Sequence, residues 1–373
     1  MVIVLEGGVS VAYEVDFVGI KDGGKDADAI AMRWQTQAGK YVNGVYDGGT
    51  KGYGEELQNI LNQYYFDSNE DTKELDFVIC SHSDQDHASG LKGILENYDV
   101  KALYMNRPWL YVTDVFDRVN DGRITEDSLA RRLRESYKYI AELEDIAKEK
   151  NIPIYETFQG NIICDKLTVL SPTKEFYLEL MVESSKTPLE YGVAAALKEL
   201  AKRAYGYVKS LVESWTEEQL REDVKTEPEN EMSVVVLGEM DEETFLLTGD
   251  AGIRGLDIAI AYSDFKGKSI VDNISFMQIP HHGSRHNVSP SILNRLVGNI
   301  VKEGNVTGKV AYVSAAVDSD HPLQMVVNAF IRRGVKVYKT KGATLHHYRK
   351  TPDRGWISAN PLTFSDKVEE WNE

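Results

Sequence analysis

Length, composition and charge set the first limits on this chain. Of its 373 residues, 42% are hydrophobic and 27% are charged, which is typical of a globular protein with a sizeable core. Acidic residues outnumber basic residues by 59 to 42, and the formal net charge of −17 argues against a general nucleic-acid coat protein. No run of about 18 apolar residues occurs, and residues 1–6 lack the basic start of a signal peptide. We therefore expect no membrane contact and a cytoplasmic location.

The first part of the chain predicts strands that lead into a polar loop. Apolar and β-branched runs separated by turn residues are typical of strands. The elements expected here are strands over 11–18, 29–34, 40–46, 75–80 and 102–105, and a helix over 54–66. Leu57, Ile60 and Leu61 give this helix its apolar face.

Two longer segments, about 108–150 and about 174–229, predict helical insertions. An apolar stripe at helical spacing runs through residues 129–147 of the first. In the second, a capping box at 187–190 precedes a stripe that continues to Trp215. Such stripes favour core packing, and a groove for a protein partner is the alternative. We interpret residues 1–373 as a single domain that carries both insertions.

Strands and helices alternate in the rest of the chain. The strands expected here cover 152–155, 161–170, 233–238, 244–248, 274–279, 310–314 and 336–338, and the helices cover 289–297 and 323–332. Strands flanked by helices on both sides favour an α/β fold built in layers.

Four residues of metal-binding type follow the strand at 75–80 within six positions. They are His82, Asp84, Asp86 and His87. In an extended loop the residues at i, i+2 and i+4 can turn toward one point, and the adjacent His87 reaches a second point. Two neighbouring cations held in this way suit hydrolysis at phosphorus or at a carbonyl carbon. Taken alone, the cluster is equally well explained as a chance group in a solvated loop.

Two later strand ends carry the same residue types. Asp250 follows the apolar strand at 244–248, and His281 and His282 follow the strand at 274–279. Three groups of this kind, each directly after an apolar strand, indicate one metal site shared between distant segments.

These motifs resemble the metallo-β-lactamase fold, whose first motif is normally His-x-His-x-Asp-His. Here Asp84 stands where the second His is usual. This variant, followed by Gly90 and later by Thr-Gly-Asp and Pro-His-His-Gly-Ser, resembles the nuclease-like domain of the ComEC-type DNA-uptake competence proteins. The Asp-Gly-Gly turn at Asp47 and the His-Pro pair at His321 are also similar. The resemblance implies an αββα sandwich with its site at the sheet edges.

The resemblance also implies two divalent metal ions, Mn²⁺, Zn²⁺ or Mg²⁺. The residues assigned to them are His82 and Asp84 for one ion, Asp86, His87 and His282 for the other, and Asp250 as a bridge. None of the eight histidines lies between His87 and His281, where most such enzymes have a further ligand. A site with more carboxylates and fewer imidazoles is harder, and this favours Mn²⁺ or Mg²⁺ over Zn²⁺.

Further roles follow from the same resemblance. Asp86 and Asp250 would act in catalysis through the nucleophilic water, and His281 would carry protons, although the order of His281 and His282 stays open. Ser284 and His321 would contact a phosphoryl oxygen or the leaving group. Asp47 is expected to orient a ligand histidine.

Three classes of function are compatible with these observations. The motif variant favours a metal-dependent phosphodiesterase or nuclease that acts on DNA. The acidity and the insertions favour a small-molecule phosphoester or cyclic-nucleotide hydrolase, and the missing histidine favours a scaffold that binds a protein partner. Residues 331–354 carry eight Lys and Arg against one Asp, and they predict either a DNA-binding groove beside the site or a solvated strand face.

Overall fold

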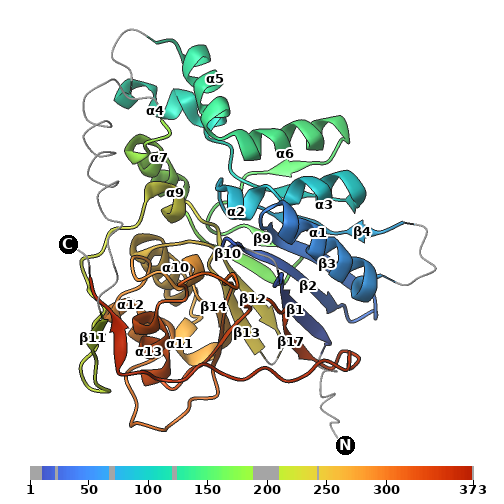
Figure 1. The fold of residues 1–373 in the computed structure, drawn as a ribbon. Helices are drawn as coiled ribbons and strands as arrows, with labels where there is room; N and C mark the ends of the chain where they lie inside the picture. Colours follow the sequence, from blue (N-terminus) through green and yellow to red (C-terminus); the bar gives the residue numbers. More distant parts are fainter. Residues whose placement is uncertain are drawn as a thin grey trace, which may run out of the picture.

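Two β-sheets packed face to face form the centre of the protein, and helices cover both outer faces (Figure 1). The computed structural model describes residues 11–21, 24–66, 72–119, 124–187, 210–241 and 243–371. Within these ranges each of the two large sheets has seven strands. The predicted α/β class and αββα sandwich are thus confirmed.

The first sheet contains both the beginning and the end of the described chain. Its strands lie in the order β17 (Leu345–Arg349), β1 (Tyr13–Phe17), β2 (Ala29–Gln35), β3 (Tyr41–Gly48), β5 (Phe77–Ile79), β7 (Leu103–Tyr104) and β8 (Ile154–Tyr155). The strands from β3 to β8 run parallel, whereas β1 is antiparallel to both β2 and β17. Two short strands, β4 (Glu74–Leu75) and β6 (Asp99–Val100), pair with each other.

The second sheet is built from the later strands. Its order is β16 (Lys336–Lys339), β15 (Val310–Val313), β14 (Ile274–Gln278), β13 (Glu243–Leu247), β12 (Val235–Met240), β10 (Leu167–Ser171) and β9 (Ile162–Ile163). The four strands from β13 to β16 are parallel, so the loops that follow them leave the sheet at one edge. The strands β3, β5, β13 and β14 finish at the same edge, and we refer to this edge as the site end.

Alternation along the strands divides the core into layers. Tyr46 and Phe77 point inward and pack in one cluster with Phe276 of the second sheet. Their neighbours Val45 and Val78 point outward into the cluster under the helices. Because successive side chains of a strand face opposite ways, one apolar run supplies both layers.

The helix layers follow from this pattern. The first sheet is covered by α1 (Lys51–Ile60) with a π-helical turn at Leu61–Tyr65, α3 (Leu91–Asn97) and α6 (Lys138–Glu149), and the second by α10 (Ile253–Phe265), α11 (Ile270–Asn273), α12 (Pro290–Leu296) and α13 (Gln324–Arg332). Among the described residues there is no helix long and apolar enough to cross a membrane.

The segment predicted as the first insertion is helical. It contains a 3₁₀ turn at Pro108–Tyr111, then α4 (Val112–Val119), α5 (Glu126–Ser136) and α6, and α4 and α5 project beyond the sandwich (Figure 1). The prediction of one helix through 129–147 is wrong, because the chain breaks at Tyr137 with φ −97° and ψ 46°. The buried Tyr137 hydroxyl lies 3.0 Å from Oγ of Ser184, and this tertiary contact accompanies the break.

The segment predicted as the second insertion contains α7 (Lys174–Glu183), β11 (Ser210–Val212) and α9 (Pro228–Glu231). Most of the predicted helical stripe falls at 188–209, outside the described residues. The helix prediction is wrong at Ser210–Val212, which pairs as a strand with β18 (Lys367–Glu369). The strand is extended because β18 offers it backbone hydrogen-bond partners, which outweigh the apolar spacing.

Candidate metal centre

The first ligand group lies where β5 ends and a short helix begins. Ser81 and His82 follow the strand, Asp84 is the residue before α2 (Gln85–Ala88), and Asp86 and His87 lie on that helix. The extended loop expected from the sequence is therefore wrong for its second half. A close approach holds the turn against β3, since a Cβ atom on Gly90 would lie only 1.9 Å from the carbonyl oxygen of Gly48.

The ligand group after β14 has a left-handed backbone. His281, His282 and Gly283 have φ values of 48°, 54° and 84°. Each non-glycine residue in this region costs on the order of 1 kcal/mol, and such residues cluster at functional sites. Asp47, at the end of β3, has φ 57° and is of the same kind. Both sheets therefore have a strained backbone where they face each other at the site end.

Four buried side chains converge between these loops. Asp28, His87, Asp250 and His282 each offer a ligand atom, and these atoms all lie within 4.8 Å of one another. We call these four residues the metal cluster. Nε2 of His87 lies 3.1 Å from Oδ1 of Asp250 and 3.9 Å from Oδ2 of Asp28. Asp86 is adjacent, with its Oδ2 at 3.5 Å from Nε2 of His282.

The donor atoms of the cluster fit a metal ion. Nε2 of His87, Nε2 of His282, Oδ1 of Asp250 and both oxygens of Asp28 are buried and have no hydrogen-bond partner among the described residues. Leaving such groups without a partner is costly. Ligand bonds to divalent ions are about 2.0–2.6 Å, so ligand atoms around one ion lie roughly 3–4 Å apart. The His87 contacts at 3.1 and 3.9 Å match this requirement, and all four ligand atoms lie within 4.8 Å.

Hydrogen bonds behind the cluster fix its imidazoles. Nδ1 of His87 lies 2.9 Å from Oδ2 of Asp47, which also accepts from the hydroxyl of Ser81. Nδ1 of His282 lies 3.1 Å from the carbonyl oxygen of Ser314. Each Nδ1 that donates to an oxygen leaves Nε2 free to bind an ion.

The carboxylates and imidazoles of the cluster shift one another's pKa. Burial raises the pKa of Asp28. Burial also opposes ionisation of Asp250, but the imidazoles of His87 and His281 outweigh it and hold its pKa well below the ordinary value. Burial lowers the pKa of His87, yet Asp250 and Asp47 outweigh that effect and raise its pKa well above the ordinary value. A raised imidazole pKa beside a lowered carboxylate pKa means that protons balance the carboxylates in the metal-free protein, and a bound cation would take the place of those protons.

A second group of donors lies beside the metal cluster. Nε2 of His82 is 3.8 Å from Oδ2 of Asp250 and 4.0 Å from Oδ2 of Asp84. Nε2 of His281 is 3.6 Å from the same oxygen of Asp250. Oδ1 of Asp84 is 2.5 Å from Nζ of Lys186. The structure thus brings every predicted ligand to one place, with a lysine among them.

An open pocket of about 420 Å³ gives access to the cluster. Its lining includes Asp86, His281, His282 and His321. Nδ1 of His321 lies 2.8 Å from Oδ2 of Asp26. Burial opposes ionisation of Asp26, but its hydrogen bond with His321 is a main cause of a pKa lowered to about 2.

Ser284 follows the left-handed turn at residues 281–283. Its side chain is buried, and Oγ accepts a long hydrogen bond of 3.4 Å from the backbone N–H of His286. It is not among the described residues that line the pocket. The structure therefore places His321, and not Ser284, at the pocket surface.

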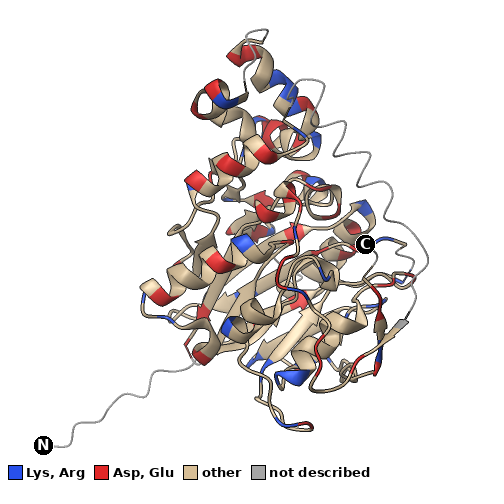
Figure 2. Cartoon of the chain, turned by 90° about the vertical axis from the view of Figure 1, so that its left-hand side faces the viewer, with Lys and Arg blue, Asp and Glu red and all other residues tan. Residues whose placement is uncertain are grey.

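Residues 331–354 do not form one basic groove. Arg332 and Arg333 are buried in ion pairs with Glu213 and Glu218. Lys339 ends β16 at the site end, and β17 then carries the chain away from that edge. Figure 2 shows basic and acidic residues interspersed on the face in view.

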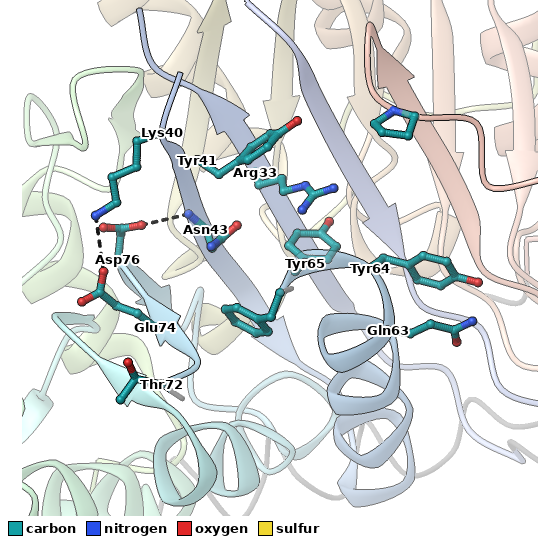
Figure 3. Close-up of a pocket in the computed structure, with 12 residues that line it drawn as sticks. Arg33, Lys40, Tyr41, Asn43, Gln63, Tyr64, Tyr65, Thr72, Glu74 and Asp76 are labelled. Atoms are coloured by element: carbon teal, nitrogen blue, oxygen red, sulfur yellow. Dashed lines mark hydrogen bonds and ion pairs between the residues drawn. The ribbon is translucent and has the colours of Figure 1, made fainter. Parts of the chain in front are cut away.

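A larger hollow of about 710 Å³ lies where β3 begins, at the edge opposite the site end (Figure 3). Its carboxylates are paired, since Glu74 and Asp76 lie 2.6 and 3.0 Å from Nζ of Lys101. The guanidinium of Arg33 lies over the rings of Tyr41 and Tyr65. This hollow has no group of converging, unpaired ligand atoms among the described residues, so it is not the candidate site.

Arg33, which lines this hollow, also belongs to a largely buried group of paired charges that we call the β1 network. It consists of Glu14, Asp16, Arg33, His346 and Arg354. Nε of Arg33 and Nη2 of Arg354 lie 2.5 and 3.0 Å from Oε1 of Glu14. Oδ2 of Asp16 lies 3.1 Å from Nη2 of Arg354, and Oδ1 of Asp16 lies 2.7 Å from Nδ1 of His346.

Sequence reasoning missed three residues of the site, namely Asp26, Asp28 and Lys186. Asp28 directly precedes the apolar strand β2, so an acidic residue at a strand start was a usable signal. Asp26 lies in the glycine-rich loop before it, and Lys186 follows α7 in the second insertion. No motif surrounds either of them.

Comparisons with known proteins add little to this geometry. No family model matches the sequence, and no curated protein matches it. Among solved structures, a long-form RNase Z from yeast matches over 90% of this chain at 9% identity, with a TM-score of 0.33. The chain spans 41% of the length of that protein.

Proposed function

We propose that this protein is a metal-dependent phosphodiesterase whose substrate is DNA. The observation that carries the proposal is the metal cluster, in which buried nitrogen and oxygen atoms from two sheets converge within 4.8 Å without hydrogen-bond partners in the described chain. A divalent ion bound there would act as a Lewis acid and lower the pKa of a coordinated water.

The residues around the ion have separate tasks in this proposal. Asp28, His87, Asp250 and His282 hold the cation, and Asp47 keeps His87 in position. Asp86 borders both the cluster and the pocket.

His321 lies on the pocket wall with Asp26 behind it, and we assign it the transfer of a proton to the leaving oxygen. Asp26 accepts from Nδ1, so Nε2 of His321 is the atom that faces the substrate. His281 is the second proton carrier that the sequence predicts, and its Nδ1 lies 2.9 Å from Oδ1 of Asn287.

The nature of the ligands favours Mn²⁺ over Zn²⁺. The cluster has two imidazoles and two carboxylates, with the carboxylate of Asp86 beside them. Carboxylate and water suit harder ions, whereas Zn²⁺ prefers nitrogen and sulfur ligands. We expect Mn²⁺ to support more turnover than Zn²⁺ in the metal-stripped protein.

A small phosphodiester is a second candidate substrate, and one observation favours it. Arg332, Arg333 and Arg354, which would give residues 331–354 their affinity for a polyanion, are held in buried ion pairs. The pocket volume of about 420 Å³ is sufficient for a small ligand.

One experiment tests the proposal and separates the two substrates. Purified protein is stripped of metal, reloaded with Mn²⁺, Mg²⁺ or Zn²⁺, and given single-stranded DNA, double-stranded DNA and bis(p-nitrophenyl) phosphate. Metal-dependent cleavage of DNA supports the proposal, and turnover of the small ester alone supports the second candidate. Cleavage that persists in chelator, or no turnover with any ion, would falsify both.

A further inference from the structure

Lys186 occupies a position beside the metal cluster that sequence analysis assigned to an ion. Its Nζ lies 2.5 Å from Oδ1 of Asp84 and 3.4 Å from Oγ of Ser83. The ammonium also lies 5.2 Å from the centre of the Tyr137 ring. The side chain is 30% exposed, so the ion pair is partly shielded from water.

The backbone around Lys186 is held by groups from both helical insertions. The Lys186 N–H donates to Oγ of Ser184, and the Ser184 hydroxyl donates to Glu229 at 2.5 Å. Tyr137, at the junction of α5 and α6, contacts the same Ser184 hydroxyl. The buried Thr187 hydroxyl donates to the carbonyl of Met181. The ammonium is therefore placed by a fixed segment, and the insertions have a specific effect on the site.

The two halves of the site differ in their ligand atoms. The metal cluster has four buried residues with atoms within 4.8 Å. The other half has Nε2 of His82, the second oxygens of Asp84 and Asp250, and Nε2 of His281. Oδ1 of Asp84 is already paired with an ammonium, and the sequence has no histidine between His87 and His281 to replace it.

We propose that each chain binds one divalent ion tightly, in the metal cluster, and that Lys186 supplies the positive charge next to Asp84 in place of a second tight ion. A cation entering the second half would have to share Asp84 with Lys186 or displace it, and would lie near the ammonium. Either course costs electrostatic free energy in a partly buried site. The proposal rests on the proposed function for its chemical meaning but concerns metal binding alone.

An ammonium and a metal ion serve the site differently. Lys186 has three N–H donors and a single charge, so it can neutralise Asp84 and hold a phosphoryl oxygen. It offers no open coordination position for water. On this proposal an ion in the metal cluster would supply the activation of water, and Asp84 with Lys186 would position the substrate.

Metal stoichiometry tests the proposal without any activity measurement. Stripped full-length protein is equilibrated with Mn²⁺ alone, passed through a desalting column and analysed for metal content, and a parallel calorimetric titration gives the affinities. We expect one equivalent to be retained by the wild type. Lys186→Met and Lys186→Gln should keep that equivalent and bind a second ion at least about tenfold more tightly than the wild type does.

Lys174→Met is the matched control, because Lys174 is an exposed lysine of α7 that pairs with Asp114. It should leave both affinities unchanged. Retention of two equivalents by the wild type would overturn the proposal. So would a second-ion affinity that does not change in either Lys186 variant, or a wild type that retains no ion. One retained ion with no phosphodiester turnover would contradict the proposed function and leave the stoichiometry proposal standing.

Discussion

The metal cluster and the β1 network are two buried groups of charges with opposite designs. In the β1 network, Arg33 and Arg354 approach Glu14 to 2.5 and 3.0 Å. In the metal cluster, the nitrogens of His87 and His282 approach Asp28 only to 3.9 and 3.7 Å. In the first group arginines lie at ion-pair distance from the carboxylates, whereas the second holds only imidazoles and carboxylates, and its Asp28 lies 3.7 Å or more from their nitrogens.

This difference separates a structural charge network from a functional one. A buried carboxylate must be neutralised, and an arginine at hydrogen-bond distance does so within the chain. Asp28 has no arginine or lysine partner among the described residues, and its neighbours are two imidazoles, another carboxylate and the hydroxyl of Ser314. Spacing and partner type, rather than burial alone, therefore mark the site.

The largest expected effect is the loss of catalysis when a carboxylate of the site is removed. Asp250→Ala and Asp86→Ala should lower phosphodiester turnover by about 10³-fold or more, because Asp250 faces both halves of the site and Asp86 borders the pocket. Turnover with saturating Mn²⁺ and the circular dichroism spectrum are the measurements.

The matched control for these variants is Glu74→Ala in the hollow opposite the site end, which should retain full turnover. Full activity in both aspartate variants would contradict the assignment of the metal cluster as the reaction centre.

A large change in stability is expected from the β1 network instead. Arg354→Met leaves Asp16 and Glu14 without one of their partners, and breaking a buried pair from one side costs about 3 kcal/mol. Urea denaturation should show this loss, whereas the amount of bound Mn²⁺ per folded chain should not change.

Lys101→Met is the control for an exposed pair and should cost less than about 1 kcal/mol. If Arg354→Met instead removed metal binding, the two groups would not be independent and the comparison would fail.

Asp28→Asn should raise, rather than lower, the free energy of unfolding of the metal-free protein. Burial raises the pKa of Asp28, so its ionised form is unfavourable in the folded state at neutral pH. Replacing it by the neutral amide should raise the metal-free free energy of unfolding by about 1 kcal/mol. The same variant should lose most of the stabilisation that Mn²⁺ gives the wild type, which is about 2.7 kcal/mol at a hundred times Kd.

Thermal or urea unfolding of the wild type and of Asp28→Asn, each with and without Mn²⁺, gives the four free energies of unfolding to be compared. A metal-free Asp28→Asn protein that is less stable than the wild type would show that Asp28 has a structural partner after all.

The parts of the site that sequence could predict are those that follow strong strand signals. Asp250 and His282 come directly after apolar runs, and parallel strands deliver their ends to one edge. His82 and His87 are close in sequence, so their proximity needs no long-range information. The αββα sandwich follows from the same alternation of strands and helices.

The remaining parts depend on contacts between distant segments. Asp28 and Lys186 reach the site from a strand start and from an insertion. The strand start was a usable signal for Asp28, whereas nothing in the local sequence points to Lys186. The basic segment at 331–354 was ambiguous for a similar reason, because the partners of Arg332 and Arg333 lie more than 100 positions earlier in the chain. Local charge counts cannot show which cations are already paired.

The smallest expected effect concerns the cations that remain at the site end. Lys339 ends β16 and Lys341 follows it, so both lie at the site end, whereas Arg349 lies on β17 opposite Tyr13, toward the other edge. Each phosphate contact contributes a log–log salt slope of about −0.7 to −0.9 to DNA binding. Replacing both lysines with Gln should therefore flatten that slope by about one to two units.

Arg349→Gln is the matched control, because the Arg349 guanidinium lies 2.9 Å from Glu243, and it should leave the slope unchanged. Hydrolysis of bis(p-nitrophenyl) phosphate should be the same in all three proteins, because this ester has no further phosphate to contact. Binding isotherms between 50 and 200 mM salt are the measurement, and a slope that Arg349→Gln flattens as much as the lysine pair would mean that DNA follows the length of β17 rather than the site end.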